Sequence, residues 1–155
     1  MTIPAWAHKA LPLCLRSRSL LEALQPAAQL AARLYVGEAF FRAGLTKIAD
    51  WETTRFLFQE EYQVPLLSPD VAAVLGTGGE LVLPVLLVAG LFGRVGALGL
   101  LVINGVAVLS LQEIAPAALQ QHVFWGSLLV AIALWGPGRW SVDAGWWPRL
   151  ASRLR

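Results

Sequence analysis

The stretch 76–93, GTGGELVLPVLLVAGLFG, decides the fold because it places one carboxylate, Glu80, in a run that is otherwise almost wholly apolar or glycine. On the surface of a water-soluble protein Glu80 would be an ordinary residue. At the centre of a membrane helix a charge costs about 2.5–3.5 kcal/mol on insertion scales and calls for a reason. The solvent around this segment therefore has to be settled first.

The composition of the chain indicates lipid. Hydrophobic residues make up 57% of the 155 residues and charged residues only 14%, whereas soluble domains carry about a quarter charged residues. The seven Trp favour a membrane interface, and the net charge of +2 is too small to indicate a nucleic-acid partner. Cys14 is the lone cysteine, so no internal disulfide forms, and no cleaved signal peptide is predicted. The composition thus predicts an integral membrane protein in contact with the bilayer.

Four segments are long enough to span a membrane, which takes about 20 mostly apolar residues. They are 27–47, 71–92, 95–112 and 119–136. A water-soluble bundle would show a charged outer face, but the third and fourth segments contain no Lys, Arg, Asp or Glu. The predicted fold class is therefore all-α, an integral membrane four-helix bundle with up-down-up-down topology.

The remaining parts of the chain flank or link these spans. Residues 1–26 are expected to form a cytoplasmic N-terminal segment, interfacial or flexible, before the transmembrane domain 27–138, and residues 139–155 a Trp/Arg-rich interfacial tail. The long link 48–70 contains WETTRFLFQEEY, whose aromatic and acidic residues predict a short helix on the outer membrane surface. An irregular loop is the alternative.

Lysine and arginine fix the predicted orientation, because cytoplasmic loops carry the excess of both. In a four-span arrangement one side receives Lys9, Arg16, Arg18, Arg33, Arg94, Arg139, Arg149, Arg153 and Arg155. The other side receives only Lys47 and Arg55, among several acids. Both termini are therefore predicted to be cytoplasmic, in a multi-pass membrane protein.

The spans give each polar residue a predicted depth. With helix centres near 37, 82, 104 and 128, Glu38, Glu80 and Asn104 fall near the midplane. Arg42 and His122 fall about 8–9 Å toward the outer face, at about 1.5 Å rise per residue. Lys47 lies higher, near the outer interface.

These residues predict a polar pocket in the outer half of the bundle. Glu38 and Arg42 form an i,i+4 pair, and Arg42 is expected to reach Glu80 as well. With one cation between two carboxylates, one of them is expected to hold a proton near neutral pH. The pocket would bind a quinone headgroup or relay protons. The alternative is a structural network that joins the helices, for which Asn104 is well suited, and His122 is equally well explained as an interface histidine.

No self-contained catalytic centre or metal site is predicted. GTGG lacks the spacing of a dinucleotide-binding fingerprint, and the two histidines, His8 and His122, lie on opposite sides and cannot ligate one haem. A zinc cluster and a Ser-His-Asp triad cannot be assembled either.

Three blocks of sequence resemble the DoxX family. They are RLYVGEAFFRAGLTKIADW at 33–51, VPLLSPDVAAVLGTGGELVLPVLLVAGLFGRVGAL at 64–98 and GPGRWSVD at 136–143. The resemblance, from about 29 to 145, implies a four-helix inner-membrane protein. Some relatives are linked to sulfur or thiosulfate oxidation with electrons passed to quinone, and others to complexes with sulfurtransferase and superoxide dismutase partners. By resemblance Lys47 and Glu80 are the first positions to test.

The sequence thus predicts a small membrane subunit of a redox system, at most part of an oxidoreductase, which binds quinone or relays protons with Glu38, Arg42, Lys47, Glu80, Asn104 and His122. Electrons would come from a soluble or membrane partner, since no metal or flavin motif is present. A non-enzymatic scaffold or small-solute carrier is the alternative. Ala39 and Ala43 on the first span would permit a homo-oligomer without requiring one.

Overall fold

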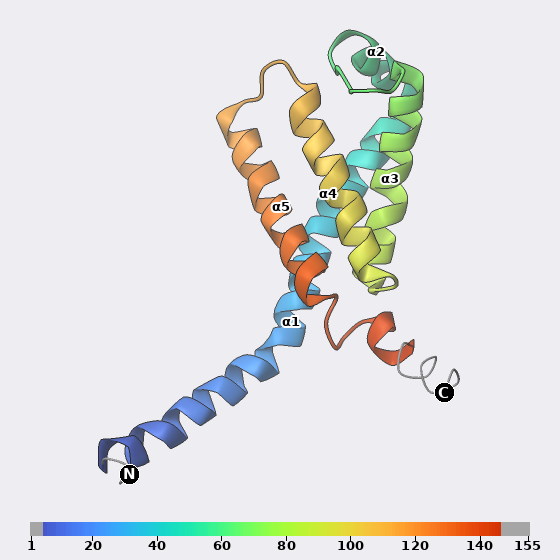
Figure 1. The fold of residues 1–155 in the computed structure, drawn as a ribbon. Helices are drawn as coiled ribbons and strands as arrows, with labels where there is room; N and C mark the ends of the chain where they lie inside the picture. The colour runs from blue at the N-terminus through green and yellow to red at the C-terminus, as the bar shows by residue number, and fades with distance from the viewer. Residues whose placement is uncertain (1–4, 147–155) are drawn as a thin grey trace.

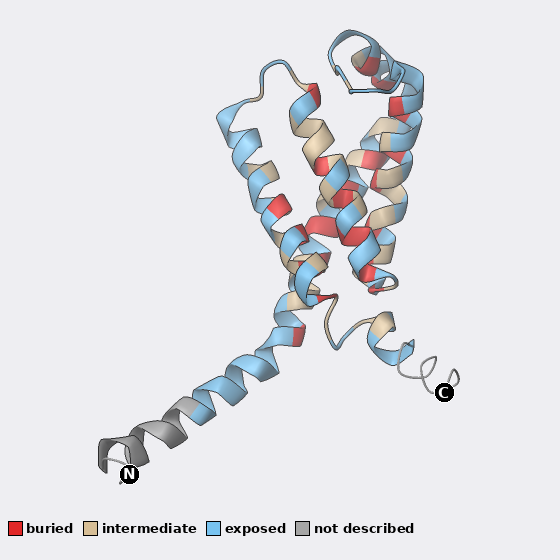
Figure 2. Ribbon diagram, in the orientation of Figure 1, coloured by how far each residue is buried: buried red, intermediate tan, exposed pale blue. Residues whose placement is uncertain are grey.

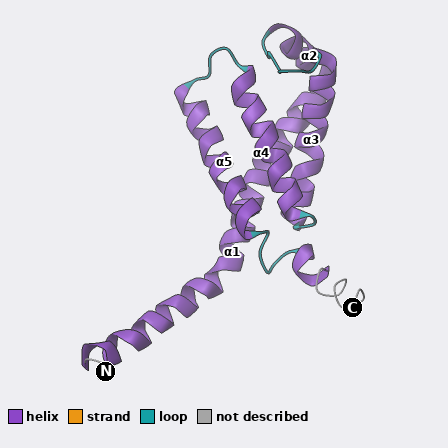
Figure 3. Ribbon diagram, in the orientation of Figure 1, coloured by secondary structure: helices purple, strands orange, loops and turns teal. Residues whose placement is uncertain are grey.

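The computed structural model describes the backbone of residues 5–146 and the side chains of residues 15–146. All the regular structure in this range is helical, as Figure 3 shows. The helices are α1 (Ala5–Ala49), α2 (Trp51–Glu60), α3 (Pro69–Ala89), α4 (Gly93–Ser110) and α5 (Pro116–Trp135), labelled in Figure 1. The predicted all-α class is confirmed.

Three of these helices, α3, α4 and α5, are long and apolar enough to cross a membrane. The first and last residues of each helix lie within three residues of the corresponding ends of the predicted span. α1 is not among them, since its bundle portion carries Arg33, Glu38 and Arg42. A membrane crossing by α1, and with it the four-span topology, stays a prediction.

The bundle is held by neighbouring helices in contact. α1 packs mainly along α3, α3 against α4, and α4 against α5. Buried side chains lie where these helices meet, and the outward faces are exposed, as Figure 2 shows. The core consists of Val36, Phe40, Leu87, Ala97, Leu100, Leu129 and Ile132.

The outward faces are themselves apolar. Val82 on α3 is 58% exposed, Val102 on α4 is 65% exposed and Leu134 on α5 is 65% exposed. In water such faces would be charged, so their natural surroundings are acyl chains. The protein is a membrane protein whose apolar helices contact the bilayer.

α1 is longer than the sequence predicted. It is one helix from Ala5 to Ala49, and its first half runs away from the bundle in Figure 1. Its 45 residues span roughly 68 Å at about 1.5 Å each, more than twice a hydrocarbon layer of about 30 Å. The expected division at residue 26 does not coincide with a helix end, because strong helix formers continue upstream of it. Residues 1–4 and the tail beyond 146 lie outside the described residues.

The register of α1 against α3 also differs from the prediction. A Cβ added at Gly44 would lie 3.1 Å from Cβ of Glu80, and one added at Gly37 would meet Val88. The middle of α3 therefore lies beside Gly44, about two turns from the predicted centre at residue 37. When a helix extends beyond the apolar window, the centre of that window does not give the membrane depth of the residues in the helix.

The predicted helix in the link 48–70 is present as α2, and the irregular-loop alternative is wrong. Asp50 is its N-cap, whose carboxylate accepts a hydrogen bond from the Thr53 amide at 3.0 Å. Thr54 and Phe58 are buried on one face. α2 lies at the end of the bundle opposite to the one by which the chain enters and leaves it (Figure 1).

Candidate functional site

A cavity of about 490 Å³ lies between the helices on the side of α2. α1, α3, α4 and α5 form its walls, while α2 and the segment after it contribute Phe58, Tyr62, Val64 and Leu67. That segment is tied to α4, since the Gln63 amide donates to the Ser110 carbonyl at 2.8 Å. The polar side chains in the lining are those of Lys47, Tyr62, Glu80, Ser110, His122 and Trp125.

The central polar feature of the cavity is an ion pair between α1 and α3. The Lys47 ammonium donates to both carboxylate oxygens of Glu80, at 2.6 and 2.5 Å. The two side chains are 22% and 10% exposed. An ammonium carries three donors, so one N–H of Lys47 is left for a further acceptor. This pair explains how Glu80 is tolerated within an apolar helix: its charge is matched by a cation from the neighbouring helix.

The predicted pair of Arg42 with Glu38 is confirmed, but the expected contact of Arg42 with Glu80 is wrong. Arg42 pairs with Glu38 at 2.7 Å, and these side chains are 76% and 61% exposed. Neither lines the cavity. Lys47 follows Glu38 by nine residues, which is two and a half helical turns, so the two project from opposite faces of α1. Each carboxylate has its own cation, and the premise of one cation shared by two carboxylates fails.

Asn104 and His122 join α4 to α5 through two hydrogen bonds. The Asn104 amide nitrogen donates to the His122 carbonyl at 3.0 Å, and the Asn104 amide oxygen lies 2.8 Å from Nδ1 of His122. The first bond orients the amide, so the second requires a proton on Nδ1. Neutral His122 therefore carries its lone pair on Nε2. Asn104 acts as the predicted link between helices and also sets the tautomer of a cavity residue.

Aromatic side chains line the cavity beside these polar groups. Trp125 packs edge-on against His122, with ring centroids 5.2 Å apart, and contacts Phe40 at 5.6 Å. Phe58 and Tyr62 pack edge-on at 5.0 Å. Trp125 Nε1 is buried without a hydrogen-bond partner among the described residues. Burial, with smaller contributions from the charges of Glu61 and Glu80, raises the pKa of the Tyr62 hydroxyl.

Sequence reasoning did not single out these aromatic residues for the site. The aromatic and acidic pattern around Phe58 and Tyr62 predicts a surface helix and does not indicate that they line a cavity. The only sequence feature that relates Trp125 to the site is its position one helical turn after His122. Ala39 and Ala43 line the cavity, and their part in a homo-oligomer stays a prediction.

The DoxX family model matches residues 28–113, more than half of the chain. This chain belongs to the DoxX family. The match contains the Lys47–Glu80 pair and Asn104 of this DoxX protein, while His122 and the GPGRWSVD block lie beyond it. No curated protein and no solved structure matches the chain.

Proposed function

We propose that this DoxX protein is the quinone-binding membrane subunit of a redox system, and that the cavity beneath α2 holds the quinone headgroup. The observation that carries the proposal is one apolar cavity lined by both a charged donor and a neutral acceptor, Lys47 and His122. A proton relay by the same residues is the companion role.

The hydrogen-bonding groups suit the two redox forms of a quinone. The free N–H of the Lys47 ammonium matches the carbonyl oxygen of the oxidised ring, and Nε2 of His122 matches the hydroxyl of the reduced ring. Glu80 keeps the ammonium in place through its two short bonds. Both forms therefore find a partner without rearrangement of the walls.

Size and lining support the same ligand class. A volume of about 490 Å³ lies within the range of small-molecule sites, which are mostly apolar with a few placed polar groups. Phe40, Phe58 and Trp125 offer ring faces and edges for an aromatic headgroup. A quinone would supply two-electron chemistry when bound, and a partner protein would exchange electrons with it.

Titration of the purified protein with a short-chain quinone tests the proposal, with quenching of tryptophan fluorescence as the signal. Trp125 lines the cavity, so Trp125→Phe should remove most of the quenching. Glu80→Gln loosens the hold on the Lys47 ammonium, and His122→Leu removes the Nε2 acceptor, so each should weaken binding about tenfold or more. Glu38→Gln is the matched control, since this carboxylate is also paired with a cation but lies outside the cavity.

Equal binding by Glu80→Gln, His122→Leu and Glu38→Gln would overturn the proposal. Absence of quenching by any quinone, with the wild-type fold intact, would favour the alternative in which the ion pair is structural and the protein acts as a scaffold or small-solute carrier.

A further inference from the structure

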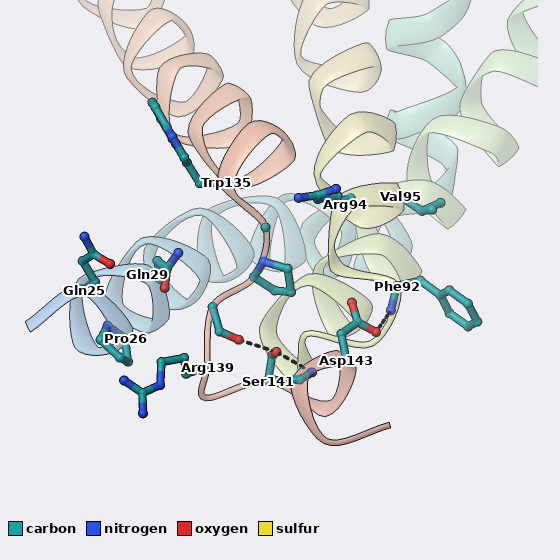
Figure 4. A pocket seen from close by; sticks show the side chains of 14 residues that line it. Gln25, Pro26, Gln29, Phe92, Arg94, Val95, Trp135, Arg139, Ser141 and Asp143 are labelled. Carbon is teal, nitrogen blue, oxygen red and sulfur yellow. Dashed lines mark hydrogen bonds between the residues drawn. The ribbon is translucent and has the colours of Figure 1, made fainter. Parts of the chain in front are cut away.

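A second pocket lies at the opposite end of the bundle from α2. Its volume is about 590 Å³, and α1, the start of α4, the end of α5 and residues 136–144 surround it. Figure 4 shows Gln25 and Gln29 on α1, Arg94 on the first turn of α4, and Arg139 on the segment after α5, with the guanidinium groups of the two arginines on different walls of the pocket. Nothing in the proposed quinone chemistry uses these residues.

The described lining of the pocket carries more positive than negative charge, with two arginines and one aspartate. Arg94 donates only a long bond, 3.4 Å, to the Leu134 carbonyl, and Arg139 has no hydrogen-bond or ion-pair partner within residues 15–146. Asp143, the one carboxylate in the lining, accepts from the amides of Phe92 and Gly93 at 2.9 and 2.8 Å. Its oxygens cap the start of α4, so the two guanidinium groups are left to bind an anion.

The segment after α5, which carries Arg139, is held by specific contacts with α1. Buried Arg33 donates to the carbonyls of Val88 and Trp140, which ties α1 to the end of α3 and to the segment after α5. Gly138 has φ = +89°, and an added Cβ would meet the Gln29 side chain. The segment that presents Arg139 is therefore held closely against α1.

The position of the pocket along the bundle indicates which kind of anion would reach the two arginines. α4 begins and α5 ends here, so the pocket lies where two apolar spans leave the hydrocarbon layer. Phe92, Trp135 and Trp140 are 48%, 73% and 59% exposed around it. Exposed indole rings favour the headgroup zone, and basic pockets between membrane helices bind anionic lipid headgroups.

We propose that this pocket binds the headgroup of an anionic phospholipid, with Arg94 and Arg139 as basic groups on different walls of the pocket and the acyl chains along the exposed apolar rim. Gln25 and Gln29 offer amide donors to the remaining headgroup oxygens. The site would select lipids by headgroup charge and anchor this end of the bundle in a leaflet rich in anionic lipid.

Native mass spectrometry of the full-length protein in mild detergent tests the proposal. The protein is titrated with phosphatidylglycerol or phosphatidylcholine of identical acyl chains. Phosphatidylglycerol should bind more tightly. Arg94→Gln or Arg139→Gln should weaken it about fivefold each, and the double variant about 25-fold, at the contribution expected of a basic residue near anionic lipid. Phosphatidylcholine binding should not change.

Three controls separate the possible outcomes. Arg55→Gln, at the opposite end of the bundle, should leave lipid binding unchanged, and Arg94→Lys should retain more of it than Arg94→Gln. Quinone quenching in the double variant reports whether the bundle is still folded. Excess inorganic phosphate should displace little lipid. Complete displacement by phosphate would show a site for soluble anions, and equal binding of the two lipids would show no headgroup selection; either result overturns the proposal.

Discussion

Two ion pairs join α3 to its neighbours, and they differ in their surroundings. Glu80 and Lys47 form the wall of the cavity and are 10% and 22% exposed, whereas Asp70 and Arg55 pair at 2.9 Å near the start of α3 and are 61% and 49% exposed. A solvated pair contributes about 0–1 kcal/mol. In a buried pair each charge has lost its water and depends on the other. The same chemistry thus creates a potential binding site in one place and a surface contact in the other.

The largest expected effect comes from breaking the buried pair. Lys47→Met should destabilise the protein by up to about 3–5 kcal/mol, because the Glu80 charge is left without its partner. Arg55→Met, the matched change in the exposed pair, should cost about 1 kcal/mol or less. Thermal unfolding in detergent, followed by circular dichroism, measures both.

The double variant Lys47→Met/Glu80→Leu sharpens this test. It removes both charges and should recover much of the stability lost in Lys47→Met, since no unpaired charge remains. Similar losses in Lys47→Met and Arg55→Met would contradict the distinction between the two pairs.

The next effect concerns the uncharged link across the same cavity. Asn104→Ala leaves the Nδ1–H of His122 without its partner, removes the side-chain bond to the His122 carbonyl, and should cost about 1–3 kcal/mol. It should also weaken quinone binding, because Nε2 is no longer fixed as the acceptor. Ser127→Ala is the control on α5: its hydroxyl donates to Val123 on an exposed face, and the change should stay within about 0.5 kcal/mol. Equal losses would mean that the link adds no more than a surface bond.

Tyr62 tests whether the buried environment extends to the segment that covers the cavity. Its raised pKa means that the folded protein favours the neutral hydroxyl. The stabilisation that comes from keeping the hydroxyl neutral is complete below the pKa of Tyr62 in the unfolded chain, near 10. It is lost as the pH rises through the higher pKa of Tyr62 in the folded protein. Tyrosinate absorbance should therefore develop late, and Tyr62→Phe should remove the late component. If Tyr62→Phe instead removed a component that titrates at the ordinary pKa, the segment would be open to water.

The smallest effect is expected at α2, whose cap is fully solvated. Hydrogen bonds from the amide and hydroxyl of Thr53 lower the pKa of Asp50. The stabilisation is present above the unfolded pKa of this carboxyl and is lost as the pH falls through the folded value. Hydrogen exchange in α2 should quicken in acid and in Asp50→Ala, while α3 stays protected. Asp50→Asn keeps a capping oxygen and should exchange as the wild type does at neutral pH. Equal quickening in α3 would show that α2 is not an independent cap.

Much of the fold could be predicted from the sequence, because the decisive signals are local. The uncharged runs in α4 and α5 follow from hydropathy alone, and α2 was found from its aromatic and acidic pattern. The upstream extension of α1 could not be found in the same way, because a search for apolar windows stops where charged residues such as Arg16 and Arg18 begin, although the helix does not.

The site was only partly predictable. Lys47, Glu80 and His122 were assigned to one pocket, and the structure places all three in the cavity lining. Arg42 was given the role of Lys47, because a depth scale built on the wrong centre of α1 misplaced both by about two turns.

The sequence by itself determined that the apolar helices belong in lipid and that Glu80 needs a cation, since transfer of a charge out of water is costly whatever the fold. Only the tertiary structure decided which cation that is, which ring nitrogen of His122 carries the proton, and that Arg94 and Arg139 line one pocket at the far end of the bundle. Those outcomes depend on the register and facing of helices distant in the chain, which are set by close contacts such as that of Gly44 with Glu80 and leave no periodic trace in the sequence.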